Sequence, residues 1–354
     1  SIRRRQRQMC IRDRFFILFK TSTINAQDSP NIIFLIGDGM GLSQITSGMY
    51  ANDNKTALEN FEYVGLSKTH SANKLVTDSA ASGTAMATGQ KTYNGVLGIN
   101  PANVRFKSIL EICQEKNYQT ALISTSSIVH ATPASFYAKN ISRYNYEDIA
   151  LQLSKHSIDI FVGGGMKYFN SRKDERNLIR EMKSYSFVKN IKQLEKSNSN
   201  KIGYLTYAAE PPKASENRTP LLKEVTKVVL NKLDSKNTPF FIMIEGSQID
   251  WAGHDNDLNY IISEFKDFDG AIQVALNFAK ADGNTLVVVT ADHETGGLGI
   301  KGGSISRNKV SGGFVTGGHT GTMVPVFSYG PNSDTFSGIY DNTKIFEKFI
   351  NSLK

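Results

Sequence analysis

Short apolar runs recur along the chain, each bounded by Gly, Asp, Asn or Ser. They span residues 32–36, 121–123, 158–162, 240–244, 286–289 and 324–327. Apolar and polar residues do not alternate clearly within them, which is typical of strands buried on both faces. Helical patterns lie between the runs, over residues 106–116, 221–233 and 258–281. Because strands and helices alternate, the sequence predicts an α/β fold with a mostly parallel sheet.

Composition and charge exclude several classes of protein. The chain has 354 residues, of which 40% are hydrophobic and 21% charged, so it is not disordered, collagen-like or a disulfide scaffold. The net charge is +8, but the seven basic and two acidic residues of 1–30 supply +5, leaving +3 for the rest. The chain after residue 30 is nearly neutral and has no large excess of basic residues, so we expect no nucleic acid as a specific partner. The longest apolar run is too short to span a membrane.

The N-terminal segment is unlike the rest of the chain. Residues 1–14 are rich in arginine and do not begin with Met, and we interpret them as a translated sequencing artefact; the alternative is a functional basic arm. Residues 15–27, with the stretch FFILF and the small residue Ala26, resemble the tail of a secretory signal peptide; the alternative is a leader of no consequence. We therefore expect a periplasmic or secreted protein. Residues 1–30 lie outside the fold, and one domain covers 31–354 with an insertion at 166–218.

Acidic and imidazole side chains follow four of the predicted strands at their carboxyl ends. They are Asp38 after 32–36; His130 and Thr132 after 121–123; Glu245, Asp250 and His254 after 240–244; and Asp292 and His293 after 286–289. Ligands of open α/β sheets bind beyond the carboxyl ends of the strands, so we expect these groups to meet at one edge. Each alone is more typical of a helix cap, a turn or a solvated pair, and only the combination indicates a site.

Carboxylates that converge without cations repel one another, and bound metal ions are the simplest remedy. Mixed Asp/His sets suit Zn²⁺, and all-oxygen sets suit Mg²⁺. Four of the six histidines lie in these segments or in the glycine-rich stretch around His319. We interpret the other two, His70 and His156, as structural or surface residues. The sequence therefore predicts a metal site at the edge of the sheet.

Residues 76–85 are rich in small side chains and contain Ser79. The segment is compatible with a tightly packed helix start capped by Asp78 or Ser79. It is also compatible with a nucleophile, since a serine at a helix N-terminus lies in a positive partial field that a nearby zinc ion would reinforce. The motifs G-x-S-x-G and G-x-x-x-x-G-K-[ST] are absent, which excludes a hydrolase elbow and a P-loop.

Six ordered segments together resemble the alkaline phosphatase family over about residues 31–353. They are IIFLIGDGMG (32–41), VTDSAASGTAMATG (76–89), HATPASFYAKNISR (130–143), IEGSQIDWAGHD (244–255), TADHETGG (290–297) and GGHTGT (317–322). The resemblance implies a three-layer α/β/α sandwich. It also implies hydrolysis of phosphate monoesters to an alcohol and inorganic phosphate at alkaline pH, through a phosphoserine intermediate. Members of the family are commonly homodimers, so we expect a homodimer.

The resemblance also implies a role for each matched residue. Ser79 is the nucleophile, and Arg143 grips the phosphate with its planar fork. Two Zn²⁺ ions and one Mg²⁺ ion are implied as cofactors. The ligands are Asp250, His254 and His319 for one zinc; Asp38, Asp292 and His293, with Ser79, for the other; and Asp38, Thr132 and Glu245 for magnesium, beside His130.

Two positions differ from those of some family members: His130 stands where some have Asp, and Trp251, in the substrate pocket, where some have Lys. Imidazole is a poor partner for Mg²⁺, so we expect a weaker or more zinc-tolerant third site. Trp251 supplies no cation near the phosphate, so we expect weaker inhibition by inorganic phosphate; the alternative is a packing residue at the pocket rim. Beyond the N-terminal segment only Cys113 is present, so the body forms no internal disulfide.

Two other functions remain as alternatives. A phosphodiesterase on the same two-metal core would not need Arg143 or the site of Thr132 and Glu245. A catalytically silent phosphate- or metal-binding protein would be indicated by the loss of Ser79 or of a zinc ligand. A sulfatase needs a modified Cys or Ser in a C/S-x-P-x-R setting, which the residues after Ser79 do not provide. The residues present favour the phosphate monoesterase.

Overall fold

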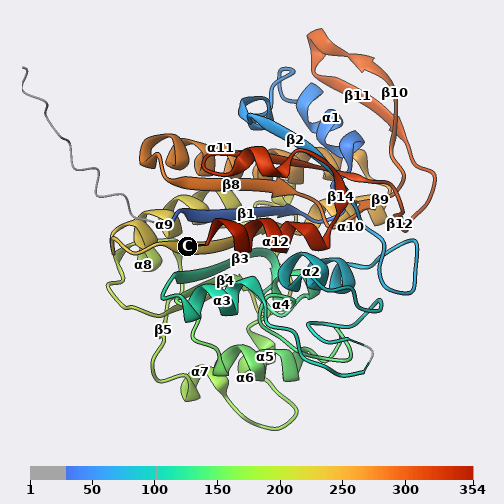
Figure 1. Cartoon of the computed structure of the whole chain (residues 1–354). Helices are drawn as coiled ribbons and strands as arrows, with labels where there is room; N and C mark the ends of the chain where they lie inside the picture. The colour runs from blue at the N-terminus through green and yellow to red at the C-terminus, as the bar shows by residue number, and fades with distance from the viewer. Residues whose placement is uncertain (1–28, 101, 354) are drawn as a thin grey trace, which may run out of the picture.

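The computed structural model describes residues 29–100 and 102–353, so the interpretations of residues 1–14 and 15–27 concern a segment outside the described residues. A ten-stranded sheet forms the centre of the molecule (Figure 1). Its spatial order is β14 (Gly338–Asp341), β2 (Tyr63–Lys68), β13 (Val324–Tyr329), β8 (Thr285–Thr290), β1 (Asn31–Gly37), β7 (Phe240–Gly246), β3 (Gln119–Ser127), β4 (Ile160–Gly164), β6 (Ile202–Leu205) and β5 (Ser186–Phe187). Neighbouring strands pair in parallel except at β13, which runs antiparallel to β2 and β8. The mostly parallel sheet is therefore confirmed.

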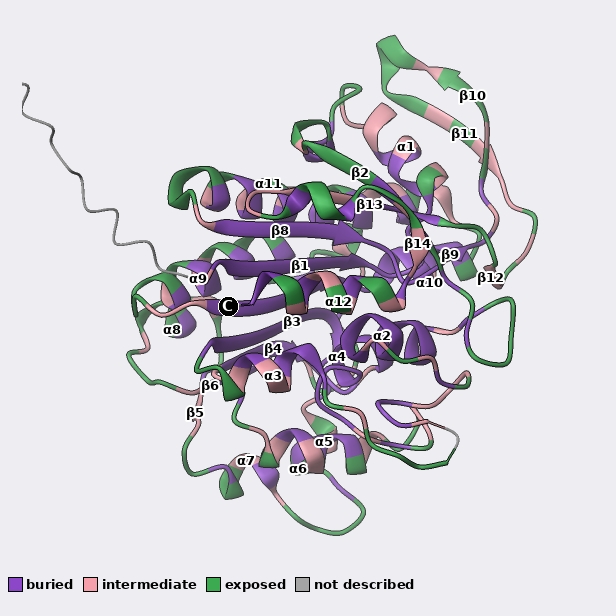
Figure 2. Ribbon diagram, in the orientation of Figure 1, coloured by how far each residue is buried: buried purple, intermediate pink, exposed green. Residues whose placement is uncertain are grey.

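Helices cover both faces of this sheet. One face packs against α1 (Leu42–Tyr50), α9 (Leu222–Asp234), α10 (Gln248–His254) and α11 (Leu258–Asp282), and the other against α2 (Ser79–Thr88), α3 (Ile109–Glu115), α4 (Ala131–Ala134), α5 (Tyr146–Lys155) and α12 (Thr343–Ser352). In β1, Ile33 and Leu35 join the first core, whereas Ile32, Phe34 and Ile36 join the second. The central strands are accordingly buried along their whole length (Figure 2), which explains why their sequences lack alternation.

The predicted elements are confirmed with shifted boundaries. All six apolar runs overlap strands, although residues 158 and 159 precede β4, and the three helical patterns correspond to α3, α9 and α11. Helix α3 begins at Ile109 rather than at residue 106, because Ser108 and Glu111 form a capping box there. Strands β2 and β14 were not predicted, because both are largely exposed at one edge and carry no continuous apolar run.

Residues 166–218, predicted to be an insertion over the sheet, lie at its other edge. They contain α6 (Lys167–Asn170), α7 (Leu178–Glu181), β5, α8 (Ile191–Lys196) and β6. Strand β6 pairs in parallel with β4 and thus extends the main sheet. That this segment is an insertion stays a prediction.

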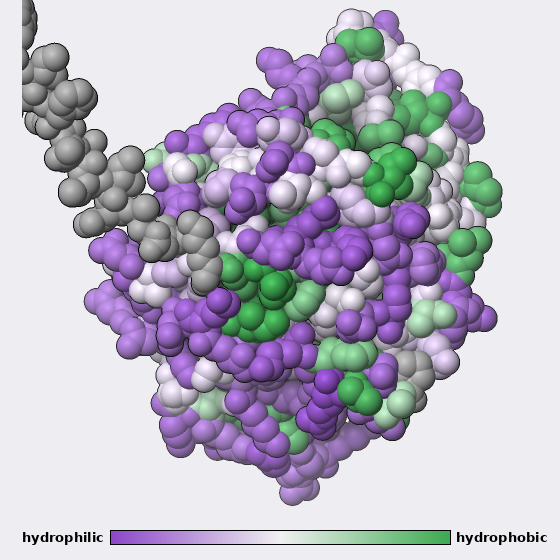
Figure 3. All heavy atoms as spheres, in the orientation of Figure 1, coloured by the Kyte–Doolittle hydropathy of each residue, from purple (hydrophilic) through white to green (hydrophobic). Residues whose placement is uncertain are grey.

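A short ladder brings a distant segment back to the end of β8. Strands β9 (Glu294–Thr295) and β12 (His319–Thr320) pair antiparallel, with His319 opposite Thr295. Between them, the hairpin of β10 (Gly299–Ser304) and β11 (Lys309–Gly313) projects away from the sheet (Figure 1). The face seen in Figure 3 is mainly hydrophilic, with small hydrophobic patches. Within the described residues, no helix has the length and apolar character needed to cross a membrane.

Candidate active site

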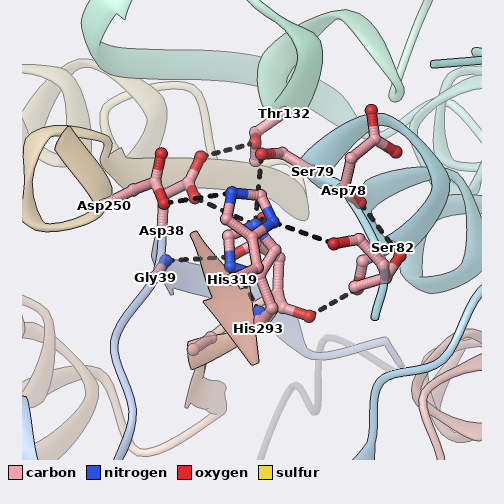
Figure 4. A network of polar contacts seen from close by, with 12 residues as sticks. Asp38, Gly39, Asp78, Ser79, Ser82, Thr132, Asp250, His293 and His319 are labelled. Carbon is pink, nitrogen blue, oxygen red and sulfur yellow. Dashed lines mark hydrogen bonds and ion pairs between the residues drawn. The ribbon is translucent and has the colours of Figure 1, made fainter. Parts of the chain in front are cut away.

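Three groups of metal-ligating side chains meet at the carboxyl edge of the sheet. They are a first cluster of Asp250, His254 and His319, a second of Asp38, Asp292 and His293, and a third of Asp38, His130 and Glu245. Within each cluster, one ligand atom of every residue lies within 4.8 Å of the others. Figure 4 shows the second cluster's Asp38 and His293 close to Asp250, His319 and Ser79. The structure thus brings together the residues that the sequence placed at the strand ends.

In the first cluster, the Asp250 carboxylate faces two imidazoles. Its oxygens lie 3.4 Å from Nε2 of His254 and 3.4 Å from Nε2 of His319. Each ring donates from Nδ1 to a backbone carbonyl, of Gly317 at 2.7 Å and of Thr77 at 2.8 Å, so both Nε2 atoms face each other across 3.1 Å. The lone pairs of these two Nε2 atoms repel each other, so a positive charge is needed between the rings. The hydrogen bond to Asp250 raises the pKa of His254 to about 9, so this group favours positive charge beside it. Two imidazoles and a carboxylate are a donor set that suits zinc.

The second cluster is fully buried and borders Ser79. Nε2 of His293 lies 3.0 Å from the Asp292 carboxylate, 3.5 Å from that of Asp38 and 3.3 Å from Oγ of Ser79. Burial favours the neutral ring, yet the Asp292 carboxylate raises the pKa of His293. Two carboxylates, an imidazole and a hydroxyl therefore converge on one point.

The third cluster shares Asp38 with the second. Oγ1 of Thr132 donates to Asp38 over 3.2 Å, so Thr132 lies where the sequence predicted it. Burial raises the pKa of Glu245 to about 7 and, together with nearby Arg143, lowers the pKa of His130 to about 3. His130 is consequently a neutral imidazole whose ring can serve as a ligand.

Four buried polar atoms of these clusters form no hydrogen bond within the described structure, although two of them lie 3.0 and 3.5 Å from Nε2 of His293. They are Oδ1 of Asp38, Nδ1 of His130, Oε1 of Glu245 and Oδ2 of Asp292. Buried polar atoms are normally paired, and each of these atoms is able to bind a cation. Burial and the carboxylates of Asp292, Asp250 and Glu245 also raise the pKa of Asp38 well above its usual range. The donor set therefore fits bound cations, and the protein is metal-binding.

Ser79 is the first residue of α2 and is only 1% exposed. The N-cap is Asp78 rather than Ser79, since Oδ1 of Asp78 accepts from the backbone N–H of Ala81 at 2.9 Å. The Ser79 hydroxyl is therefore not used as a cap and faces His293. The segment is a capped helix start that presents a serine to the second cluster, and the role of Ser79 as the nucleophile stays a prediction.

Arg143 reaches the same place from the loop before α5. Its guanidinium donates to Oδ2 of Asp78 over 3.1 Å and lies 3.5 Å from Nε2 of His130. Burial opposes its charge, but the Asp78 carboxylate raises the pKa of Arg143. Trp251, in α10, is half-buried and packs edge-on against His130 with ring centroids 5.9 Å apart. Asp78 thus has two functions, as the cap of α2 and as the partner of Arg143.

Sequence reasoning missed the polar residues behind the clusters. Ser124 lies opposite Glu245 in the β3–β7 ladder and donates to its Oε2 over 2.7 Å. Ser126 and Ser247 contact Ser124 at 2.7 and 3.0 Å, so the hydroxyl is held in place. Similarly, Thr295 bonds Asp250 at 2.5 Å and Nδ1 of His293 at 3.2 Å, and so joins the first two clusters. The run of hydroxyl residues at 124–127 was the available signal for the serine group.

We expect Ser124→Ala to weaken Mg²⁺ binding about tenfold or more, because residues that orient metal ligands typically contribute 10- to 100-fold. Ser124 occupies Oε2 of Glu245 and leaves Oε1 for a cation. Calorimetric titration of the protein with Mg²⁺ measures the effect. Ser328→Ala, which removes a buried hydroxyl bonded to the Ser333 carbonyl, is the matched control. Equal affinities for Ser124→Ala and wild type would contradict the orienting role.

The architecture and the site together define the class of protein. A buried serine at a helix N-terminus, beside clusters that fit several cations at the carboxyl edge of a parallel sheet, is the arrangement of a metal-dependent hydrolase. Comparison with known proteins identifies the family more closely.

A family model described as alkaline phosphatase matches residues 29–312. Alkaline phosphatase 3 of Bacillus subtilis is 36% identical and covers 93% of this chain and 90% of its own. The solved alkaline phosphatase of the Antarctic bacterium TAB5 is 42% identical, with a TM-score of 0.86 over 92% of this chain and 98% of its own. A variant of that enzyme, with a histidine replaced by aspartate and Mg bound in the M3 site, is 41% identical at the same TM-score and coverage. The chain belongs to the alkaline phosphatase family and is an enzyme that hydrolyses phosphate monoesters.

Proposed function

We propose that the reaction proceeds through a phosphoserine on Ser79, with Zn²⁺ in the first and second clusters and Mg²⁺ in the third. The observation that carries the proposal is the position of Ser79: its buried Oγ lies 3.3 Å from His293 of the second cluster. When bound, the cations would neutralise the carboxylates of their ligands and the negative charge of a phosphoryl group.

The chain's own residues bind and orient the substrate. The planar fork of Arg143 binds two phosphoryl oxygens, and Asp78 holds that fork in place. The N-terminus of α2 adds a positive partial field to the same point. Oγ of Ser79 attacks phosphorus, the alcohol departs, and water then takes the phosphoryl group from serine, which releases inorganic phosphate. Positioning and charge neutralisation supply most of the rate.

The principal test compares three chromogenic substrates, a phosphate monoester, the matching diester and the matching sulfate, at pH 7 to 10. We expect fast monoester hydrolysis that a chelator abolishes and added Zn²⁺ and Mg²⁺ restore. A diester rate above the monoester rate in zinc-loaded protein would instead favour a phosphodiesterase on the same core. No turnover of any substrate would favour a silent phosphate-binding protein.

We expect His130→Asp to raise the Mg²⁺ affinity of the third cluster about tenfold or more, because carboxylate oxygen suits Mg²⁺ and imidazole does not. The solved TAB5 variant with Mg in its M3 site, in which an aspartate also replaces a histidine, supports this expectation. A Mg²⁺ titration measured by calorimetry gives the affinity. An unchanged dissociation constant would refute the prediction.

We expect Trp251→Lys to strengthen inhibition by inorganic phosphate roughly tenfold, because a half-buried ammonium group near the bound phosphate attracts it. Trp251 instead presents a neutral ring that packs against His130. The inhibition constant for phosphate is the measurement, with Trp251→Phe as the control that retains the aromatic packing. The same inhibition constant in the Lys and Phe variants would leave Trp251 as a packing residue.

We further propose that the enzyme is periplasmic or secreted and works as a homodimer on small phosphate monoesters. The signal-like residues 15–27 support export from the cytoplasm. The homodimer rests on the family resemblance. The nearly neutral charge of the chain after residue 30 favours small molecules over nucleic acids as partners.

A further inference from the structure

A cavity of about 400 Å³ lies between α3 and α5 and shares no residue with the three clusters. We call it the α3–α5 pocket. Its lining includes the cations Arg105, Lys107, Lys139 and Lys155, with Glu111 as the carboxylate. This volume lies within the range of sites that hold small organic molecules. The catalytic chemistry described above makes no use of it.

The α3–α5 pocket carries more positive charge than its own carboxylate balances. Glu111 accepts from Nζ of Lys139 at 2.9 Å and also bonds the backbone of Ser108. Lys107 pairs with Glu115 at 2.7 Å. Within the described part of the chain, Arg105 and Lys155 have no carboxylate partner. Two cationic groups are therefore left to attract an anion.

One cation of the pocket, Lys139, is largely buried and is held by neighbouring residues. The Lys139 side chain is 8% exposed, and its backbone N–H donates to Gln152 of α5 at 2.8 Å. Burial lowers the pKa of Lys139, and repulsion by the positive charge of nearby Arg105 lowers it further. A bound anion would relieve the repulsion between these two cations.

Aromatic rings form another part of the wall. Tyr137 is fully buried, and its hydroxyl donates to the carbonyl of Ile128. Its ring packs edge-on against His156, with centroids 5.9 Å apart. Phe106 is half-buried and also lines the cavity. The pocket thus combines cations that bind oxygen atoms with ring surface that binds an apolar or aromatic group.

We propose that the α3–α5 pocket binds a tetrahedral oxyanion, phosphate or sulfate, either free or carried by a small organic molecule. Arg105, Lys139 and Lys155 would hold the oxyanion, and an organic portion would lie against the half-buried ring of Phe106. A guanidinium fork and ammonium groups are the usual partners of such oxygens. This site is additional to the catalytic one.

Calorimetry of the metal-loaded enzyme tests the proposal with two probes. Sodium sulfate is a bare tetrahedral oxyanion, whereas 3′,5′-cyclic AMP is a phosphodiester with an aromatic base. We expect the double variant Arg105→Ala/Lys155→Ala to weaken binding of the preferred probe about tenfold or more, with monoester hydrolysis unchanged. The control is Lys227→Ala/Lys266→Ala, which removes the same charge from exposed positions on α9 and α11.

The outcomes separate the two sources of the oxyanion. If Arg105→Ala/Lys155→Ala loses sulfate binding and the control variant does not, the site takes a free anion. If Arg105→Ala/Lys155→Ala loses only cyclic AMP binding and the control variant does not, the site takes an organic phosphate. The proposal is overturned if neither probe binds wild type at about 10 mM, a concentration that detects even weak millimolar sites. It is also overturned if both double variants bind as wild type does.

Discussion

Ser79→Ala is expected to reduce monoester hydrolysis on the order of 10⁴-fold or more, the scale seen when a covalent nucleophile is removed. The methyl group fits the space of the buried side chain, and Asp78 still caps α2, so we expect the fold to persist. The effect should fall on kcat rather than on KM, because the proposed phosphate contact of Arg143 would be unchanged. Steady-state kinetics of a chromogenic monoester provide the measurement.

The control for this variant is Thr88→Ala, which removes another buried hydroxyl from the opposite end of α2. It should retain activity with a modest loss of stability. Rapid quenching in acid followed by mass spectrometry tests the intermediate directly: wild type should carry a phosphoryl group within residues 76–89, and Ser79→Ala should not. A Ser79→Ala enzyme with near-wild-type kcat and zinc content would show that another group is the nucleophile.

Much of the site was predictable because it follows a local rule. Asp38, Glu245 and Asp292 stand at or just after the carboxyl ends of β1, β7 and β8, and parallel pairing brings those ends to one edge. A buried strand and the residue after it are neighbours in sequence, so inspection of the sequence finds both. The same argument covers His293, which follows Asp292 directly.

Other parts depend on pairings that no local pattern contains. His319 reaches the first cluster through the β9–β12 ladder, and Ser124 meets Glu245 only because β3 and β7 adopt one particular register. The partly exposed strand β2 pairs with β13 at one side of the sheet and has no continuous apolar run to reveal it. Family resemblance supplied His319, whereas Ser124 became apparent only from the structure.

Asp38→Asn is expected to lower activity on the order of 10³-fold or more, because Asp38 is the residue shared by the second and third clusters. Asp250→Asn alters the first cluster alone. Metal analysis should therefore find a deficit at two sites in Asp38→Asn and at one site in Asp250→Asn. The control is Asp269→Asn: this buried carboxylate accepts from Thr56 and Ala57, away from the clusters, so its metal content should match wild type.

The difference in thermal stability between Asp38→Asn and wild type should have opposite signs in the metal-loaded and the chelated enzyme. In the loaded enzyme, Asp38→Asn removes a ligand and should be less stable than wild type. In the chelated enzyme, four carboxylates remain buried together, and burial and Asp292 already raise the pKa of Asp38. Removing one buried like charge then relieves repulsion, so chelated Asp38→Asn should be more stable than chelated wild type. If Asp38→Asn were less stable than wild type in both states, the predicted relief of repulsion among the buried carboxylates would be contradicted.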